Sequence, residues 1–186
     1  MKHPVSREFF TYWESKRGEA RAPERSDVDP SVLRELLGDI FVLAYDDAAT
    51  YPFRVAGTRV CALFGRDVKD QSLPALFAGQ HRRDIAEIIA AVAEDVLPAV
   101  AGLTATAADD STTHLELLLL PFTTRAHCPI TLTGVLAPFE AGHRGTLGEL
   151  QLTSWRYIHP PQQKLVPRAL RKLAIARGLM VYEGLS

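Results

Sequence analysis

The sequence predicts an α+β domain in which short helices and one longer helix cover one face of a five-stranded antiparallel sheet, preceded by an N-terminal helical extension. Two β-like segments lie at 39–45 and 52–57, and three more follow residue 98. A long amphipathic helical stretch at 80–97 separates the two groups. Strands and helices that are grouped rather than strictly alternating are typical of the α+β class.

The composition suits one domain with extensions. A chain of 186 residues that is 47% hydrophobic can bury a core. Its formal net charge of −1 gives no general attraction to nucleic acid or anionic membranes, so we expect no nucleic-acid partner. Two cysteines are too few for a disulfide framework and favour a reducing cytoplasm.

The sequence shows neither a secretory signal nor a membrane span. The N-terminus lacks a secretory pattern. Glu94, Asp95 and Pro98 interrupt the most apolar window, so we expect no membrane span.

An amphipathic helix is predicted at 4–17, closed by Gly18. Phe9, Tyr12 and Trp13 lie on one face of it. These aromatic side chains form either a dimer interface or a contact with the chain's own domain, because an amphipathic stripe does not reveal which molecule it faces.

The next elements follow from capping residues and β-branched runs. The stretch "DPSVLRELLG" predicts a short helix capped by Asp29 and stopped by Gly38. "DIFVLAY" and "PFRVAG" predict an antiparallel hairpin. The chain then turns at Gly57 into a short helix that Thr58 caps and Gly65 closes.

A brief helical piece, "DQSLPALF", precedes the long helix, which buries Ile85, Ile88, Ile89, Val92 and Val96 and ends before Pro98. Three strands are predicted at 99–108, 113–123 and 130–138. The later segment "LQLTSWRYI" adds a strand or packs along the sheet.

The segments "RSDVDPSVLRELLGDIFVLAYD", "FRVAGTRVCALFGRDVKDQSL" and "LELLLLPF...ITLTGVLAP" together resemble bacterial stand-alone PAS proteins in which a helix precedes the first PAS strand. The resemblance covers about residues 5–140, and its most specific pieces are "DVDP", "AGT" and "LFGR" in this order. It implies a helical extension at 1–38, a PAS-like domain at 39–140 and a C-terminal extension at 141–186. Asp70 departs from the pattern, because many PAS sequences have Gly there.

PAS membership implies sensing, ligand binding or protein association without choosing among them. We predict a cytoplasmic, bacterial, non-catalytic PAS signalling protein, a homodimer, that binds a small ligand or a protein partner and signals through altered protein association. The alternatives are a small-molecule enzyme on a cone-like α+β scaffold and a DNA-associated regulator. Convergence of Asp39, His81, His114 and Glu116 in a closed cavity would favour the enzyme.

A set of apolar side chains is predicted to lie between the sheet and the helices. Such a set suits a small apolar ligand or a solid core, because apolarity does not report empty volume. The candidate lining residues are Phe41, Leu43, Phe53, Val55, Val60, Phe64, Leu73, Phe77, Ile88, Val92, Leu118 and Leu132.

Two cofactors, haem and flavin, occur in PAS relatives. His81, His114 and His127 could coordinate iron, and only His81 lies near the long helix where haem-binding PAS proteins place their ligand. Its polar "QHRRD" context favours a capping or surface role. Cys61 and Cys128 do not match the flavin-adduct position of light-sensing relatives, so no adduct is expected.

The C-terminal tail has the strongest local charge bias. This bias suits an acidic partner, a phosphate backbone or a membrane surface. The alternative is an amphipathic helix with Leu170, Leu173 and Ala174 packed inward and its basic groups in solvent. The basic residues are Lys164, Arg168, Arg171, Lys172 and Arg177.

Overall fold

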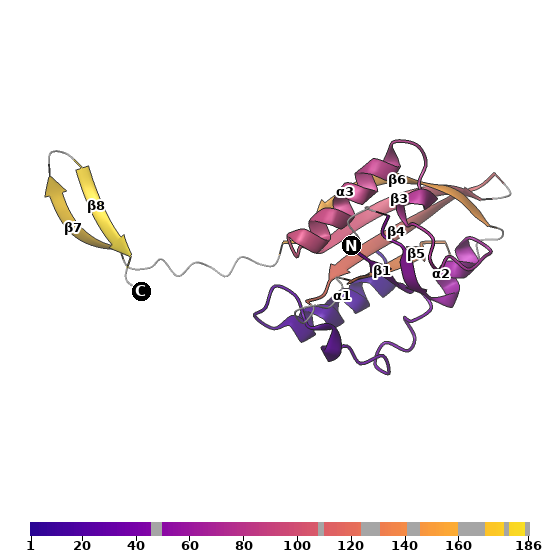
Figure 1. The fold of residues 1–186 in the computed structure, drawn as a ribbon, viewed down its shortest axis with the longest axis horizontal. Helices are drawn as coiled ribbons and strands as arrows, with labels where there is room; N and C mark the ends of the chain where they lie inside the picture. Colours follow the sequence, from indigo (N-terminus) through magenta and orange to yellow (C-terminus); the bar gives the residue numbers. More distant parts are fainter. Residues whose placement is uncertain are drawn as a thin grey trace.

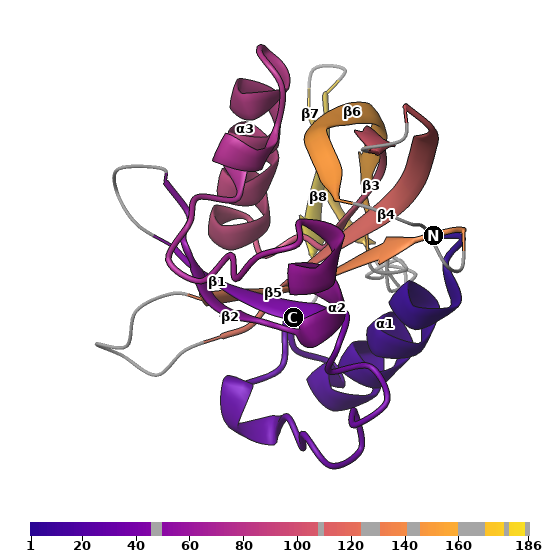
Figure 2. The ribbon, with the colours of Figure 1, turned by 90° about the vertical axis from the view of Figure 1, so that its right-hand side faces the viewer.

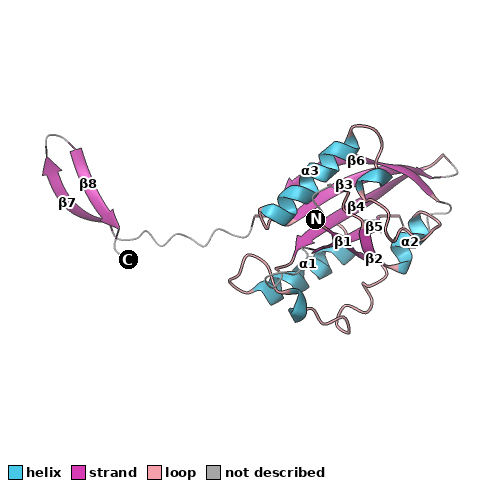
Figure 3. Cartoon of the chain, viewed as in Figure 1, coloured by secondary structure: helices cyan, strands magenta, loops and turns pink. Residues whose placement is uncertain are grey.

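The computed structural model describes residues 1–45, 50–107, 110–123, 131–140, 146–159, 170–176 and 179–184. The helices are α1 (Pro4–Arg17), α2 (Thr58–Leu63) and α3 (His81–Glu94), with short 3-10 helices η1 (Arg25–Asp27) and η2 (Pro74–Leu76). The strands are β1 (Ile40–Ala44), β2 (Phe53–Ala56), β3 (Ala99–Ala107), β4 (Thr112–Pro121), β5 (Thr131–Pro138), β6 (Leu147–Tyr157), β7 (Leu170–Ala176) and β8 (Leu179–Gly184). Figure 3 colours these elements by type. None of the helices in the described ranges is long and apolar enough to cross a bilayer.

The main sheet is antiparallel and has the strand order β2-β1-β5-β4-β3-β6. The five predicted strands are all present, but the predicted number is one short. β6, which contains all of "LQLTSWRYI" except its last residue, pairs with β3 along its length, from Ala99↔Tyr157 to Ala107↔Leu147. It joins the sheet because Leu147 and Leu150 share the face that the helices cover.

Helices lie on both faces of the sheet, as Figures 1 and 2 show. α2, η2 and α3 cover one face, here called the inner face, and α1 lies against the other, the outer face. β4 contributes to both, because successive side chains of a strand alternate between faces. Leu117 and Leu119 belong to the inner cluster, whereas Leu118 and Leu120 belong to the outer cluster.

The strand-to-helix segment after β1 is confirmed. β2 ends at Ala56, α2 begins at Thr58, and Gly65 closes it with φ +62°. Gly57 rather than Thr58 is the residue before the helix. A side chain is excluded there, because a Cβ on Gly57 would lie 2.2 Å from the carbonyl oxygen of Leu37.

Two predicted helices are wrong. Residues 30–39 form successive turns rather than a helix, although Asp29 Oδ1 accepts bonds from the N–H and hydroxyl of Ser31 as a cap would. Buried Leu33 and Leu36 hold these turns against the outer face. In the tail, residues 170–176 form β7, which pairs with β8 instead of forming an amphipathic helix.

The long helix is confirmed, but it ends at Glu94 rather than near 97. Val96 follows with φ +53°, a left-handed conformation that stops a helix. Val96 therefore packs at the margin of the outer cluster, not on the inner face with Ile85 and Val92.

Candidate functional site

Ten of the twelve predicted lining residues meet in one buried cluster between the inner face and α2, η2 and α3. This inner cluster consists of apolar side chains with Tyr51 among them, so it can hold a packed core or accept an apolar ligand. The ten are Phe41, Leu43, Phe53, Val60, Phe64, Leu73, Phe77, Ile88, Val92 and Leu132.

Val55 and Leu118 do not line this cluster. The register of β1 with β2 shifts between Val42 and Leu43, so Val55 lies opposite Val42 and its side chain is 54% exposed. Leu118 is buried, but in the outer cluster beneath α1. A single apolar run such as "LELLLL" does not reveal which alternate residues face which layer.

Further members of the inner cluster were not predicted. They come from the alternate residues of β3, β4 and β5 and from β6. The period-two pattern of these strands could have identified most of them, whereas the role of β6 depended on its pairing with β3. They include Leu103, Leu115, Leu117, Leu119, Leu136 and Leu150.

The aromatic face of α1 packs on the chain's own sheet. Phe9 and Trp13 are 1% and 2% exposed, and the Trp13 indole N–H donates to the Pro121 carbonyl at 2.8 Å. The Tyr12 hydroxyl accepts from the Asp29 N–H at 2.7 Å. Two of the three predicted interface side chains thus follow the second interpretation, contact with their own domain. The homodimer itself stays a prediction.

A carboxylate fixes the start of α1. Glu116, on the outer face of β4, is 4% exposed and accepts from the backbone N–H groups of Lys2 at 2.6 Å and His3 at 3.1 Å. Together with Trp13 and Pro121, this contact fastens both ends of the helix to one strand. No local pattern indicates this pairing, because its partners lie 114 residues apart in the chain.

Four side chains would indicate an enzyme if they met in one closed cavity, and they do not converge. They are Asp39, His81, His114 and Glu116. Asp39 pairs with Arg59 at 2.7 Å, and that hydrogen bond raises the pKa of the Arg59 guanidinium. His81 lies at the start of α3, 3.6 Å from Asp84. His114 is exposed and lies 3.3 Å from Glu140.

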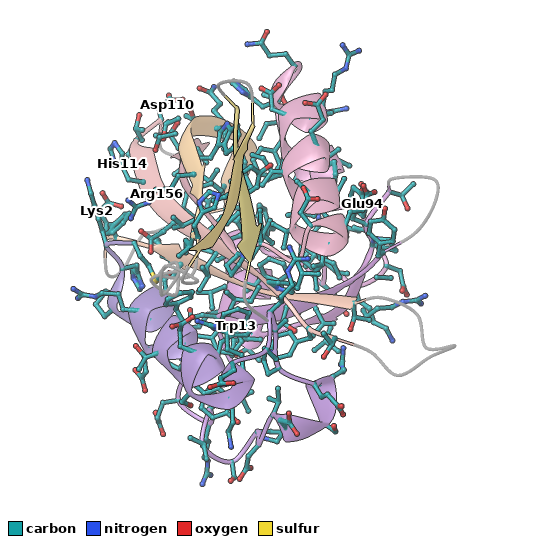
Figure 4. The ribbon with its side chains drawn as sticks, turned by 90° about the vertical axis from the view of Figure 1, so that its left-hand side faces the viewer. Lys2, Trp13, Glu94, Asp110, His114 and Arg156 are labelled. Atoms are coloured by element: carbon teal, nitrogen blue, oxygen red, sulfur yellow. The ribbon has the colours of Figure 1, made fainter. Side chains whose placement is uncertain are left out.

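His114 and Glu116 line an open groove of about 540 Å³ on the outer face. Lys2, Phe139 and Arg156 also line it. Figure 4 shows Lys2, His114 and Arg156 in this region of the molecule. Asp39 and His81 lie elsewhere, so the groove does not gather the proposed catalytic set.

The remaining predicted residues are partly outside the described ranges. Cys61 is half-buried, with its Sγ 3.9 Å from Asp67 Oδ1. Arg171 and Lys172 lie on β7. The residues outside the described ranges are His127, Cys128, Lys164, Arg168 and Arg177.

Two solved structures are similar to this chain. The chain is similar to a LOV protein of Rhodobacter sphaeroides, with 16% identity and a TM-score of 0.43 over 56% of this chain and 64% of that one. It therefore spans less than two thirds of that protein. It is also similar to the PAS domain of an HTR-like protein from Haloarcula marismortui, with 19% identity and a TM-score of 0.42 over 59% and 91% of the two chains. No curated protein matches.

The family model described as "PAS domain" matches residues 1–137, which is most of the chain and includes α1. The match agrees with the order of strands and helices around the inner cluster and with the resemblance carried by "DVDP", "AGT" and "LFGR". The chain therefore belongs to the PAS domain family.

Proposed function

We propose that this chain is a cytoplasmic, non-catalytic sensory protein that forms a homodimer and converts binding of a small apolar ligand or a protein partner into altered protein association. Membership of the PAS family supports the sensory part of the proposal. The absence of convergence among Asp39, His81, His114 and Glu116 in the described structure favours binding over catalysis.

One observation supports a relay from the inner cluster to α1. β4 presents Leu115, Leu117 and Leu119 to the inner cluster, and on its opposite face it holds α1 through Glu116 and Pro121. A displacement of this strand by a ligand on the inner side would move both attachment points of the helix. Ligand binding changes the helix only if it favours one arrangement of β4 over another.

The ligand is tested on the protein as purified. Native mass spectrometry reports a retained small molecule as added mass, and an absorption spectrum reports a haem or flavin. Val92, buried in the inner cluster, supplies the matched variant. Val92→Phe should fill a ligand cavity, remove the added mass and keep the fold. If the cluster is solidly packed, the same change should instead destabilise the protein by about 1–3 kcal/mol with no mass to lose.

The homodimer is tested on the exposed side of α1, since its buried side is already occupied. Native mass spectrometry should give twice 20.5 kDa. Thr11→Arg with Ser15→Arg changes exposed positions of α1 and should dissociate the dimer. Ala62→Arg, on an exposed position of α2, is the control and should leave it intact. A monomer at every concentration would reject the homodimer and leave the ligand proposal standing.

A further inference from the structure

The sheet has an open edge at β6. β6 is the last strand of the order, and along the described residues its far side is bonded at Leu150, whose carbonyl accepts from the Ala78 N–H at 2.9 Å. Near its end, the Ile158 N–H donates to the Pro98 carbonyl beside β3. Because backbone groups alternate along a strand, the N–H and C=O of Trp155 and Tyr157 face away from β3. An edge of this kind accepts an added strand.

The opposite edge of the sheet, at β2, is not open in this way. β2 has only four residues, and the loop after α2 covers it: the Phe53 N–H donates to the Gln71 carbonyl and the Asp70 N–H donates to the Phe53 carbonyl. The open stretch at Trp155 and Tyr157 is therefore not a general feature of both ends of the sheet.

An exposed aromatic side chain lies on the same stretch. Trp155 is 48% exposed and makes an edge contact with Tyr157, with ring centroids 5.1 Å apart. Tyr157 in turn packs against the inner cluster. A strand added beside β6 would cover Trp155 on the side that faces α3.

Among the described residues, two strands of the tail pair with each other and not with the main sheet. β7 and β8 form a separate two-stranded sheet, with Arg171 opposite Glu183 and Lys172 opposite Tyr182. An isolated hairpin of two strands is marginally stable in water. The hairpin sequence is rich in Leu, Ile, Val and Met, which two strands alone cannot bury.

The charge of the tail and the length of the chain between β6 and β7 also agree with contact between the tail and the edge of β6. Burial, and then the carboxylates of Asp95 and Glu87, raise the pKa of Tyr157, so these two carboxylates act on the end of β6. The tail from Lys164 to Glu183 has five basic residues against one acidic residue. Residues 158–169 separate β6 from β7, and twelve residues greatly exceed the two to five that typically join adjacent antiparallel strands.

We propose that the β7–β8 hairpin of the same chain docks on the open edge of β6, with β7 bonding the outward backbone groups of Trp155 and Tyr157 and covering the Trp155 ring. The occupant of this edge is thus the chain's own basic tail. The docked tail extends the main sheet and places the chain's C-terminal segment beside α3.

Hydrogen exchange in the full chain tests this assignment. In the docked state, the amide hydrogens of Trp155 and Tyr157 should exchange at least about tenfold more slowly than in Ala174→Pro. That change places proline in the middle of β7, where it removes a donor and disrupts pairing. Gln162→Pro, in the sequence between β6 and β7, is the matched control and should leave both rates unchanged. Leu103, on buried β3, reports that the main sheet is intact in both variants.

Added salt should accelerate exchange at Trp155 and Tyr157 in the unmodified chain, because it screens the attraction between the tail and the acidic groups. Equal, rapid exchange in the unmodified chain and in Ala174→Pro would overturn the proposal. Protection that is lost when Thr11→Arg with Ser15→Arg dissociates the dimer would also overturn it, by assigning the edge to the hairpin of a second copy.

Discussion

At the scale of single residues, backbone conformation explains a departure from the family pattern. Asp70, where many PAS sequences have Gly, has φ +62°. Asp and Asn occupy this left-handed region more readily than other side-chain-bearing residues. A left-handed φ at this position is therefore compatible with Gly or with a short polar residue.

The exposed location of Asp70 makes it a test of conformation alone. Asp70→Val should destabilise the protein by about 1–2 kcal/mol, because a β-branched residue is strained at this φ. Asp70→Gly should stay within about 1 kcal/mol of the unmodified protein. Urea unfolding measures both. Equal stability of the Val and Gly variants would show that the turn relaxes out of the left-handed region.

Gly134 is required by a close contact across the sheet. It lies opposite Phe41 in the pairing of β5 with β1, and a Cβ there would be 2.2 Å from the Phe41 ring and 2.7 Å from the Leu118 carbonyl oxygen. The Phe41 ring therefore fills the place of the missing side chain.

Gly134→Ala should destabilise the protein by about 1–3 kcal/mol through overpacking. Gly148→Ala, in β6, is the matched control, since its Cβ would be 3.3 Å from the nearest atom, the Thr106 carbonyl oxygen. Thermal unfolding should separate the two variants clearly. A Gly134→Ala protein as stable as the control would mean that Phe41 moves aside without cost.

At the scale of elements, the position of α1 depends on polar contacts at its two ends as well as on apolar burial. Glu116 holds the backbone before the helix, and Pro121 holds Trp13 near its end. Both acceptors lie on β4, so the helix and the strand should move together.

Removing the first contact should free one end of α1 only. Glu116→Ala leaves the N–H groups of Lys2 and His3 without an acceptor and should cost about 1–3 kcal/mol. Glu116→Gln keeps a carbonyl oxygen and should cost less. Hydrogen exchange should increase in the first turn of α1 and stay unchanged around Trp13. Uniform destabilisation of the whole helix would contradict separate anchoring of the two ends.

At the scale of the whole molecule, β6 extends the folded unit beyond the family match, which ends at residue 137. Leu150 is fully buried in the inner cluster, and β6 pairs with β3 over most of its length. The sheet therefore crosses the domain boundary predicted at 140, so β6 should unfold together with the other strands.

Leu150→Ala should cost about 2–5 kcal/mol, because it opens a cavity in the shared core. Leu152→Ala, only partly buried on the same strand, should cost less. Denaturation followed by two probes should show a single transition. A separate early transition for β6, with the remaining sheet unaffected by Leu150→Ala, would show that the strand is an independent addition.

Much of the fold could be predicted from local patterns. The period of α3 placed Ile85 and Val92 inward, and β-branched runs placed five strands correctly, because these patterns reflect which side of an element is buried. The same reasoning failed at 30–39 and at Val55, where turns and a register shift override the local pattern.

By itself, the sequence determined the order of elements, most of the apolar set on the inner face and the PAS resemblance, since each depends on periodicity within short stretches. Only the tertiary structure decided that Phe9 and Trp13 cover the chain's own sheet, that Glu116 holds the start of α1, and that β6 forms an edge. The physical reason is that a buried face or a polar side chain carries no local mark of its partner. The partner is set by strand pairing between segments far apart in the chain.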